Sequence, residues 1–230
     1  MTRHVIVNAD DFGASAGTNR GIVECHTRGV LTSTSMMVTG AAVQEAVELS
    51  RAQPGLAVGL HWDVIGEDER EFDLDDHAAV KDEFAVQLER FHGLMGKGPT
   101  HVDSHRHMHL DESVRELFAE LAAPLGVPLR GDGQVRFVGN FYAQWEWGVT
   151  DLEHVSTRAL EEILREEVGE GWTELSCHPG YVSDDYTPMY RHEREAELRT
   201  LTDPRIRTAI EELGITLESY ATYAEHAGRA

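Results

Sequence analysis

The sequence predicts an α/β protein built as a single distorted (β/α) barrel with about seven parallel strands. Three observations support this fold class. Short runs rich in β-branched residues alternate with helical patterns along the whole chain, which is typical of a parallel sheet with helical crossovers. The 230 residues contain no internal repeat, low-complexity tract or linker, so one domain over 1–230 is expected. About seven β/α units fit a closed or nearly closed barrel better than an open sheet.

Seven segments have the length and composition of strands buried in a parallel sheet. These segments are 4–9 (HVIVNA), 31–38 (LTSTSMMV), 56–60 (LAVGL), 100–104 (THVDS), 127–130 (VPLR), 173–177 (TELSC) and 215–217 (ITL). The carboxyl ends of such strands meet at one rim of a barrel, where active sites of this architecture lie. The residues at these ends are therefore the first candidates for function.

Helical patterns fill most of the intervals between the strands. They cover 15–28, 41–52, 80–95, 111–125, 156–168, 203–214 and 217–227. The best marked begins with Asp203 as N-cap and Pro204 at the first helical position, and it stops at Gly214. Two aromatic stretches, 131–150 and 181–192, are expected to be long loops. Long loops in compact domains tend to be lids or binding walls.

Composition excludes several classes of partner. The chain has 41 acidic and 20 basic residues, a formal net charge of −21, so it would be repelled by nucleic acid and by anionic membranes. No stretch approaches the roughly 18 apolar residues of a membrane helix, and the start of the chain lacks a signal-peptide pattern, so a cytoplasmic protein is expected. Cys25 and Cys177 are expected to be buried thiols without a disulfide.

Five of the seven predicted strands end in polar or ionisable residues. These are Asn8, Asp10 and Asp11 after the first strand, His61 and Asp63 after the third, the histidine-rich run after the fourth, Arg130 after the fifth and His178 after the sixth. Each has a structural explanation when taken alone, such as an Asx cap for the paired aspartates or a hydrogen-bonded core histidine. Their coincidence at one rim favours an active site.

The run HVDSHRHMH at 101–109 places His101, Asp103, His105, His107 and His109 on alternate residues, which on a strand means one face. Neighbours on that face lie about 6.6 Å apart, so at most one or two of the five can bind the same ion. A carboxylate from the first strand and an imidazole from the third are the natural further ligands. Two imidazoles and one carboxylate leave positions open for water and substrate, the pattern of a catalytic metal.

Five segments together resemble a known family. VNADDFG, TSTSMMVTGAA, GLHWD, PTHVDSHRHMH and ELSCHPGY are similar, in order and spacing, to motifs of the YdjC-like carbohydrate deacetylases, over nearly the whole chain. The resemblance implies a distorted barrel of seven strands. It also implies a hydrolase that uses one divalent metal ion, magnesium or zinc, to remove acetyl groups from N-acetylated sugars.

The resemblance also assigns roles to residues. It implies that Asp11, His61 and His105 bind the metal, that Asp10 is the general base and that His178 is the general acid. Arg130 is expected to hold Asp10 ionised through a charge-assisted hydrogen bond. The remaining polar residues of the run, Asp103, His107 and His109, are expected to orient the metal ligands.

The chain departs from the family pattern beside His61. Many members carry GLHLNLT, whereas this chain has Trp62, Asp63 and Val64, followed by a short acidic segment, 66–79, that is expected to form one wall of the substrate cleft. Loop aromatics suit stacking on sugar rings or packing between loop and barrel. These aromatics are Tyr142, Trp145, Trp147 and Tyr181.

Two other functions stay open. A phosphoesterase on a barrel scaffold would hold two or more metals and act on phosphate esters, but apart from Arg130 the strand ends carry almost no basic residue. A non-catalytic carbohydrate- or metal-binding homologue would bind sugar without releasing acetate. The expected partner is a small acetylated mono- or oligosaccharide. The sequence leaves open whether the chain forms a homodimer.

Overall fold

The computed structural model describes residues 2–66, 70–146, 148–182 and 188–227. Within them the named strands form one parallel sheet in the order β4-β3-β2-β1-β6-β5, and β7 pairs with the first part of β1. The strands are β1 (Arg3–Phe12), β2 (Ser33–Met36), β3 (Ala57–Trp62), β4 (Val102–Ser104), β5 (Arg136–Val138), β6 (Gly171–Cys177) and β7 (Ile215–Glu218). The sheet curls into a half-barrel, and the fold class predicted from the sequence is confirmed.

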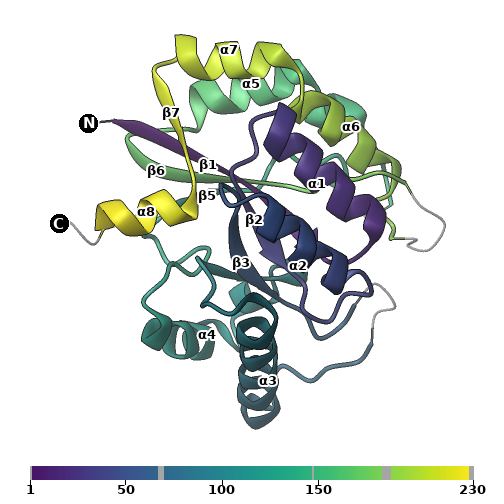
Figure 1. Ribbon diagram of the computed structural model, residues 1–230, viewed down its shortest axis with the longest axis vertical. Helices are drawn as coiled ribbons and strands as arrows, with labels where there is room; N and C mark the ends of the chain where they lie inside the picture. The colour runs from purple at the N-terminus through teal and green to yellow at the C-terminus, as the bar shows by residue number, and fades with distance from the viewer. Residues whose placement is uncertain (1, 67–69, 147, 183–187, 228–230) are drawn as a thin grey trace.

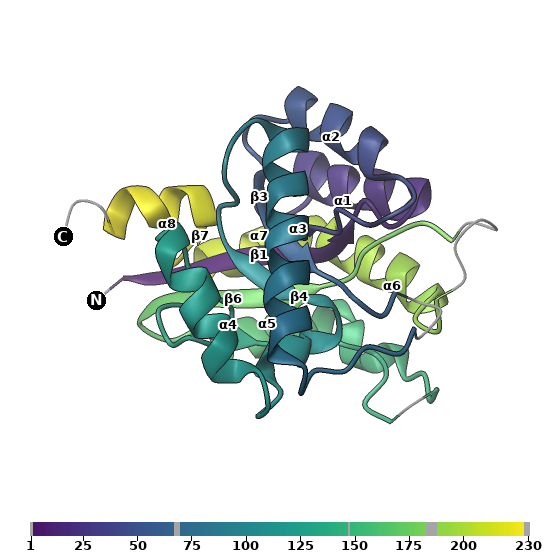
Figure 2. The ribbon, with the colours of Figure 1, turned by 90° about the horizontal axis from the view of Figure 1, so that it is seen from below.

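Helices surround the sheet on its outer side (Figures 1 and 2). They are α1 (Ala16–Arg28), α2 (Val43–Ala52), α3 (His77–Met95), α4 (Arg115–Ala122), α5 (Thr157–Glu166), α6 (His192–Leu201), α7 (Pro204–Glu212) and α8 (Tyr220–Ala227). Contacts between neighbours run α4-α3-α2-α1-α6-α5-α7, which follows the strand order. None of the helices in the described segments is both long enough and apolar enough to span a membrane.

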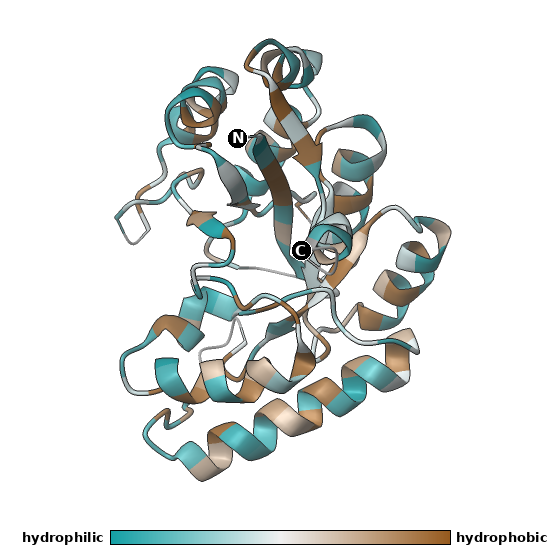
Figure 3. Ribbon diagram, turned by 90° about the vertical axis from the view of Figure 1, so that its left-hand side faces the viewer, coloured by the Kyte–Doolittle hydropathy of each residue, from teal (hydrophilic) through white to brown (hydrophobic). Residues whose placement is uncertain are grey.

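The two faces of the strands differ in chemistry. Along β1, Val5, Val7 and Ala9 belong to the main hydrophobic core. The helices that cover this face alternate hydrophobic and hydrophilic residues along their length (Figure 3). The intervening Asn8 and Asp10 are equally buried but point to the other face, where side chains from several strands meet across the sheet. That face is the concave one. It is polar toward the carboxyl end of the strands, whereas Ile6, nearer the amino end, belongs to a small separate hydrophobic cluster.

Most predicted elements are present, and α7 has the predicted cap, with Asp203 accepting a hydrogen bond from the Arg205 backbone. The fifth predicted strand, 127–130, is reduced to one bridge between Leu129 and Val102. The segment 131–150 is not entirely loop, because it contains β5.

The helix α6 was missed by the sequence analysis. The reason is its composition, since its buried residues include Glu193, Arg194 and Glu197, so the burial does not follow a hydrophobic pattern. The two cysteines are free and buried, as expected.

Candidate active site

The carboxyl end of β1 directs two consecutive carboxylates into one site. Successive side chains on a strand point to opposite faces, so Asp10 and Asp11 would normally diverge. The register of β1 against β2 shifts between Ala9 and Phe12, and Asp11 adopts a left-handed backbone with φ of 68°. This irregularity turns Asp11 back toward the concave face, where both carboxylates are buried.

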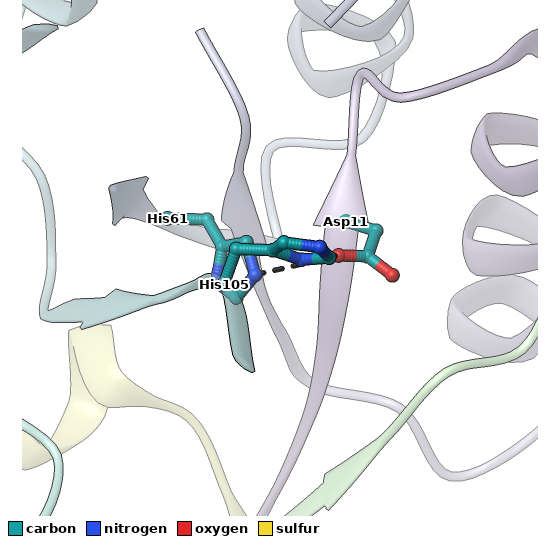
Figure 4. A group of neighbouring side chains, drawn as sticks. All are labelled: Asp11, His61 and His105. Atoms are coloured by element: carbon teal, nitrogen blue, oxygen red, sulfur yellow. Dashed lines mark hydrogen bonds and ion pairs between the residues drawn. The ribbon is translucent and has the colours of Figure 1, made fainter. Parts of the chain in front are cut away.

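Asp11, His61 and His105 form a group suited to one metal ion (Figure 4). Each residue offers one potential ligand atom, and these three atoms all lie within 4.8 Å of one another. Asp11 Oδ1 is 3.3 Å from His61 Nε2 and 3.2 Å from His105 Nδ1. All three residues are buried, and they come from β1, β3 and the segment after β4. The structure brings together the three ligands that the family resemblance implied.

The group passes a test of fit to a metal that is independent of the resemblance. His61 Nδ1 lies 2.7 Å from Asp103 Oδ1, an arrangement that fixes the ring. The other nitrogen, Nε2, is buried and lies 3.3 Å from Asp11 Oδ1, but it makes no hydrogen bond of good geometry to any described residue. A histidine held by a carboxylate on one nitrogen and presenting the other is the usual arrangement of a metal ligand. The position of Asp103 is therefore the one that the predicted orienting role requires.

The histidine-rich run does not continue as a strand. Strand β4 ends at Ser104, and residues 105–110 form a 3₁₀ turn in which Arg106 and His107 are left-handed. The alternation that predicted one face for the whole run therefore stops at Ser104, because the chain changes direction there. Only His105 joins Asp11 and His61.

The other histidines of the run contact different partners from those predicted. His109 lies 2.6 Å from Ser104 Oγ and 3.0 Å from the carbonyl oxygen of Arg130. His107 Nδ1 is 3.4 Å from the Arg130 guanidinium. His101 stacks on the Tyr220 ring. The expectation that His107 and His109 orient metal ligands is therefore corrected, since both support Arg130.

A second acidic group beside the first is already bridged by a cation. Ligand atoms of Asp10, His61 and Asp103 are close enough for a metal, but the buried Arg130 guanidinium lies among them. It donates to both oxygens of Asp10 at 2.8 and 2.7 Å and lies 2.8 Å from Asp103 Oδ2. A metal ion at the same place would meet this positive charge. The arrangement favours one metal rather than the two or three of the phosphoesterase alternative.

The electrostatics keep both aspartates ionised. Burial acts to raise the pKa of Asp10, but the Arg130 charge and its hydrogen bonds outweigh this and hold the pKa well below its usual value. For Asp11 burial is likewise outweighed, chiefly by Arg194, which donates to Oδ2 at 2.6 Å and holds the pKa of Asp11 low. Arg194, on the unpredicted α6, is thus a site residue that sequence reasoning missed.

His178 stands on the other side of Asp10. Its Nε2 lies 3.7 Å from Asp10 Oδ2, its backbone N–H donates to Glu197, and the rings of Tyr142 and Tyr190 pack against it at 5.4 and 5.7 Å. Burial lowers the pKa of His178 to about 4, although the nearby aspartates act to raise it. The imidazole is therefore neutral at pH 7 in the metal-free protein, and it must receive a proton before it can donate one.

These groups lie in one pocket of about 470 Å³, a size that suits a small ligand. Its walls come from the segments around Tyr142 and Tyr190. Residues 66 and 70–79 of the acidic segment do not line it, so this part of the segment does not form the expected wall, and residues 67–69 lie outside the described residues. Trp145 lines the pocket, is 64% exposed and stacks on His154.

The other loop aromatics have different positions. Tyr181 is not among the lining residues, and its hydroxyl donates to Glu24. The ring of Tyr142 stacks on that of Tyr190, with 4.3 Å between ring centroids. Trp147 lies outside the described residues. Among the described aromatics of this set, Tyr142 and Trp145 therefore border the pocket and Tyr181 does not.

Comparison with known proteins shows the family of the chain. Residues 4–212 match the model of a family described as YdjC-like protein. The chain belongs to the YdjC-like family. The chitooligosaccharide deacetylase of Escherichia fergusonii is 34% identical and aligns with 96% of this chain and 99% of its own. That of Salmonella paratyphi B is also 34% identical, with 93% and 96% covered.

Solved structures show the same fold. A putative cellobiose-phosphate cleavage protein from Enterococcus faecalis superposes with a TM-score of 0.77 at 26% identity, covering 97% of this chain and 99% of that one. A family 4 carbohydrate esterase from Streptomyces lividans, solved with acetate, superposes with a TM-score of 0.55 at 15% identity, covering 93% and 91%. The second likeness is one of fold alone. The family expected from the sequence motifs is confirmed.

Proposed function

We propose that this protein is a metal-dependent carbohydrate N-deacetylase, a hydrolase that removes an acetyl group from an N-acetylated sugar or a short chitooligosaccharide. The observation that carries the proposal is the adjacency of two buried groups in one pocket. Asp11, His61 and His105 make a three-ligand group, and Asp10 lies beside it, ionised and held by Arg130. The names of the curated relatives support the same class of enzyme.

One divalent ion, magnesium or zinc, held by Asp11, His61 and His105 would lower the pKa of a water molecule and polarise the acetyl carbonyl. The chain's own residues supply the proton transfers. Asp10 takes a proton from the attacking water, because Arg130 keeps it ionised at neutral pH and fixes its orientation. Water adds to the carbonyl carbon, and the amide C–N bond then breaks to give acetate and a free amine.

His178 delivers the proton to the departing amine. Its Nε2 is 3.7 Å from the oxygen of Asp10, so a small approach of the two groups, or one bridging water, would let it accept the proton that Asp10 has taken from water. This route accounts for a general acid that is neutral before the reaction begins. Arg194 keeps Asp11 ionised through its hydrogen bond to Oδ2, and its positive charge offsets part of the negative charge of the buried carboxylates.

The pocket and its rim support a sugar substrate. The exposed ring of Trp145 at the pocket edge would stack on a pyranose ring, and no nucleic acid or membrane is needed to explain any feature of the site. The phosphoesterase alternative is disfavoured by the position of Arg130. A purely binding role is disfavoured because the proposed base, the proposed acid and the three proposed ligands all line one pocket. The cytoplasmic location expected from the sequence stays a prediction.

The test is acetate release from N,N′-diacetylchitobiose. Protein stripped of metal with a chelator is reconstituted with magnesium, zinc, manganese or cobalt, one ion at a time, and bound metal is counted. The proposal predicts release that requires one ion per chain and identifies the working metal. Protein that binds one ion but releases no acetate from this or a monomeric N-acetylated sugar would contradict the proposed activity while leaving the metal site intact.

A further inference from the structure

The interior of the half-barrel below the pocket holds charged and aromatic groups that the proposed reaction does not use. The largest are Glu174 on β6 and Tyr220 at the start of α8, and both are buried. Burying a carboxylate is costly unless it is paired and hydrogen-bonded. Barrel interiors of this kind are ordinarily filled by branched apolar side chains, so a buried acid here requires an explanation.

Glu174 accepts hydrogen bonds from the Arg130 guanidinium, which also holds the proposed general base, Asp10. Arg130 donates from Nε and from one terminal nitrogen to Glu174 Oε1, at 3.0 and 2.6 Å. From its two terminal nitrogens it donates to the oxygens of Asp10, at 2.8 and 2.7 Å. The planar guanidinium is therefore held by Asp10 at one edge and by Glu174 at another, and Asp103 Oδ2 lies 2.8 Å from the terminal nitrogen that the two edges share. It cannot rotate away from Asp10 without breaking charge-assisted hydrogen bonds to Glu174.

Tyr220 fixes Glu174 in turn. The Tyr220 hydroxyl donates to Glu174 Oε2 at 2.7 Å, so the two oxygens of this carboxylate have different partners. The Tyr220 ring stacks on His101 with 3.9 Å between centroids, and its backbone N–H donates to Ser33 Oγ at 3.1 Å. Ring, hydroxyl and backbone of Tyr220 are each engaged, so its position is closely determined.

Tyr220 reaches this place from the opposite end of the molecule. β7 pairs with the first residues of β1, at the amino end of the sheet, and α8 follows it there. Figures 1 and 2 show α8 beside the N terminus and α6, which carries Arg194, on the other side of the molecule. The contacts therefore form one continuous buried path from α8 through Glu174 and Arg130 to Asp10.

We propose that Glu174 and Tyr220 are positioning residues for the deacetylation reaction, which hold the general base Asp10 through Arg130 from the amino end of the barrel. The inference rests on the proposed function. Neither residue contacts the substrate pocket, and neither contacts Asp11, His61 or His105. Their loss should therefore slow turnover without weakening substrate or metal binding.

Glu174→Gln, Tyr220→Phe and Tyr223→Phe test the inference. The last is the matched control, because Tyr223 lies on the same helix and loses only a hydroxyl contact to Gln134 at the surface. In the metal-reconstituted enzyme we expect Glu174→Gln to lower kcat by about 10- to 100-fold with KM unchanged, since a small displacement of a base has an effect of that size. Tyr220→Phe should lower kcat by a smaller factor, and Tyr223→Phe should match the wild type.

Two readouts do not depend on activity. Zinc binding, measured by isothermal titration calorimetry, should stay at one ion per chain with unchanged affinity in all three variants. The crystal structure of Glu174→Gln should show the Arg130 guanidinium displaced from Asp10. If Glu174→Gln does not fold, Tyr220→Phe decides the matter.

An unmoved Arg130 with wild-type kcat in Glu174→Gln would overturn the inference. So would equal losses in Tyr220→Phe and Tyr223→Phe, or a loss of zinc together with activity, because each indicates a general structural role. Absence of acetate release by the wild-type protein would instead reject the proposed function. The position of Arg130 in the Glu174→Gln crystal would still decide whether Glu174 positions Arg130 and Asp10.

Discussion

The convex and the concave face of the same sheet carry different kinds of side chain, mainly hydrophobic on the convex face and mainly polar or charged on the concave face around the pocket. On the convex side, Leu60 and its neighbours pack under the helices in one continuous hydrophobic core. On the concave side, His61 and Asp103 meet across adjacent strands, and the buried Arg130 joins carboxylates from β1 and β6. Side chains alternate along a strand. The same strands can therefore supply the hydrophobic residues that stabilise the fold on one face and the polar residues of the candidate active site on the other.

Among substitutions on the two faces, the largest effect on activity is expected on the concave face, at His105. His105→Ala removes one of three ligands of the proposed metal site, so the chain should lose both bound metal and turnover, by about 10³-fold or more, since the metal supplies several kcal/mol of transition-state stabilisation. Metal content and acetate release measured on the same preparation test this.

His92→Ala, an exposed histidine at the end of α3, serves as the control and should change neither quantity. Full metal affinity in His105→Ala would show that the ligand assignment is wrong.

A substitution of His178, on the concave face, distinguishes an effect on the reaction from an effect on metal binding. His178→Ala should keep the metal and lose mainly kcat, by about 10²- to 10⁴-fold, because a general acid contributes that much and His178 is not one of the three grouped ligands. Steady-state kinetics together with a zinc titration distinguish the two effects. Loss of metal affinity in this variant would mean that His178 is a ligand.

The convex face should respond in the opposite way. Leu60→Ala deletes a fully buried side chain beside His61, so the free energy of unfolding should fall by about 2–5 kcal/mol. The zinc affinity of the folded protein should not change, because the adjacent His61 points to the other face. Urea unfolding and calorimetric titration of the same variant measure both. A large change in zinc affinity with little loss of stability would contradict the division between the two faces.

A smaller effect, on the pH dependence of the free energy of unfolding, is expected from Glu197, which is buried behind the pocket wall. Burial raises the pKa of Glu197 to about 8 from a reference value of 4.5, so the folded chain holds a proton that the unfolded chain releases. This group should therefore make the protein progressively less stable as the pH rises from 4.5 to about 8, with no further loss above that.

Glu197→Gln removes the titration, so its unfolding free energy should fall less steeply than that of the wild type over this range. Urea unfolding at several pH values from 5 to 9 provides the comparison. Identical slopes for the two proteins would show that Glu197 does not titrate differently in the folded state.

The sequence predicted what depends on regular strands and on strong residue types. Alternation of strands and helices predicted a distorted (β/α) barrel, which the structure shows as a half-barrel, and the motifs predicted that Asp11, His61 and His105 would meet. The expected hydrogen bonds of Arg130 to Asp10 are present. These predictions succeeded because each depends on a strand end, and the ends of parallel strands gather at one rim.

The remaining features depend on backbone irregularity and on buried charge, which hydrophobic patterns do not reveal. Arg106 and His107 adopt a left-handed backbone and end the alternation of the histidine-rich run. The run contains no glycine, the residue that would normally indicate such a turn in the sequence. Arg194 lies on a helix whose buried face is ionic. Glu174 stood inside a predicted strand, but its partner Tyr220 is 46 residues away and becomes visible only in three dimensions.

The most direct test of the central claim is anomalous diffraction from crystals of the zinc-loaded protein. We expect one zinc peak, bound by Asp11, His61 and His105, with the Arg130 guanidinium still hydrogen-bonded to Asp10. Zinc between Asp10 and Asp103, with Arg130 displaced, or two zinc ions in the pocket, would contradict it.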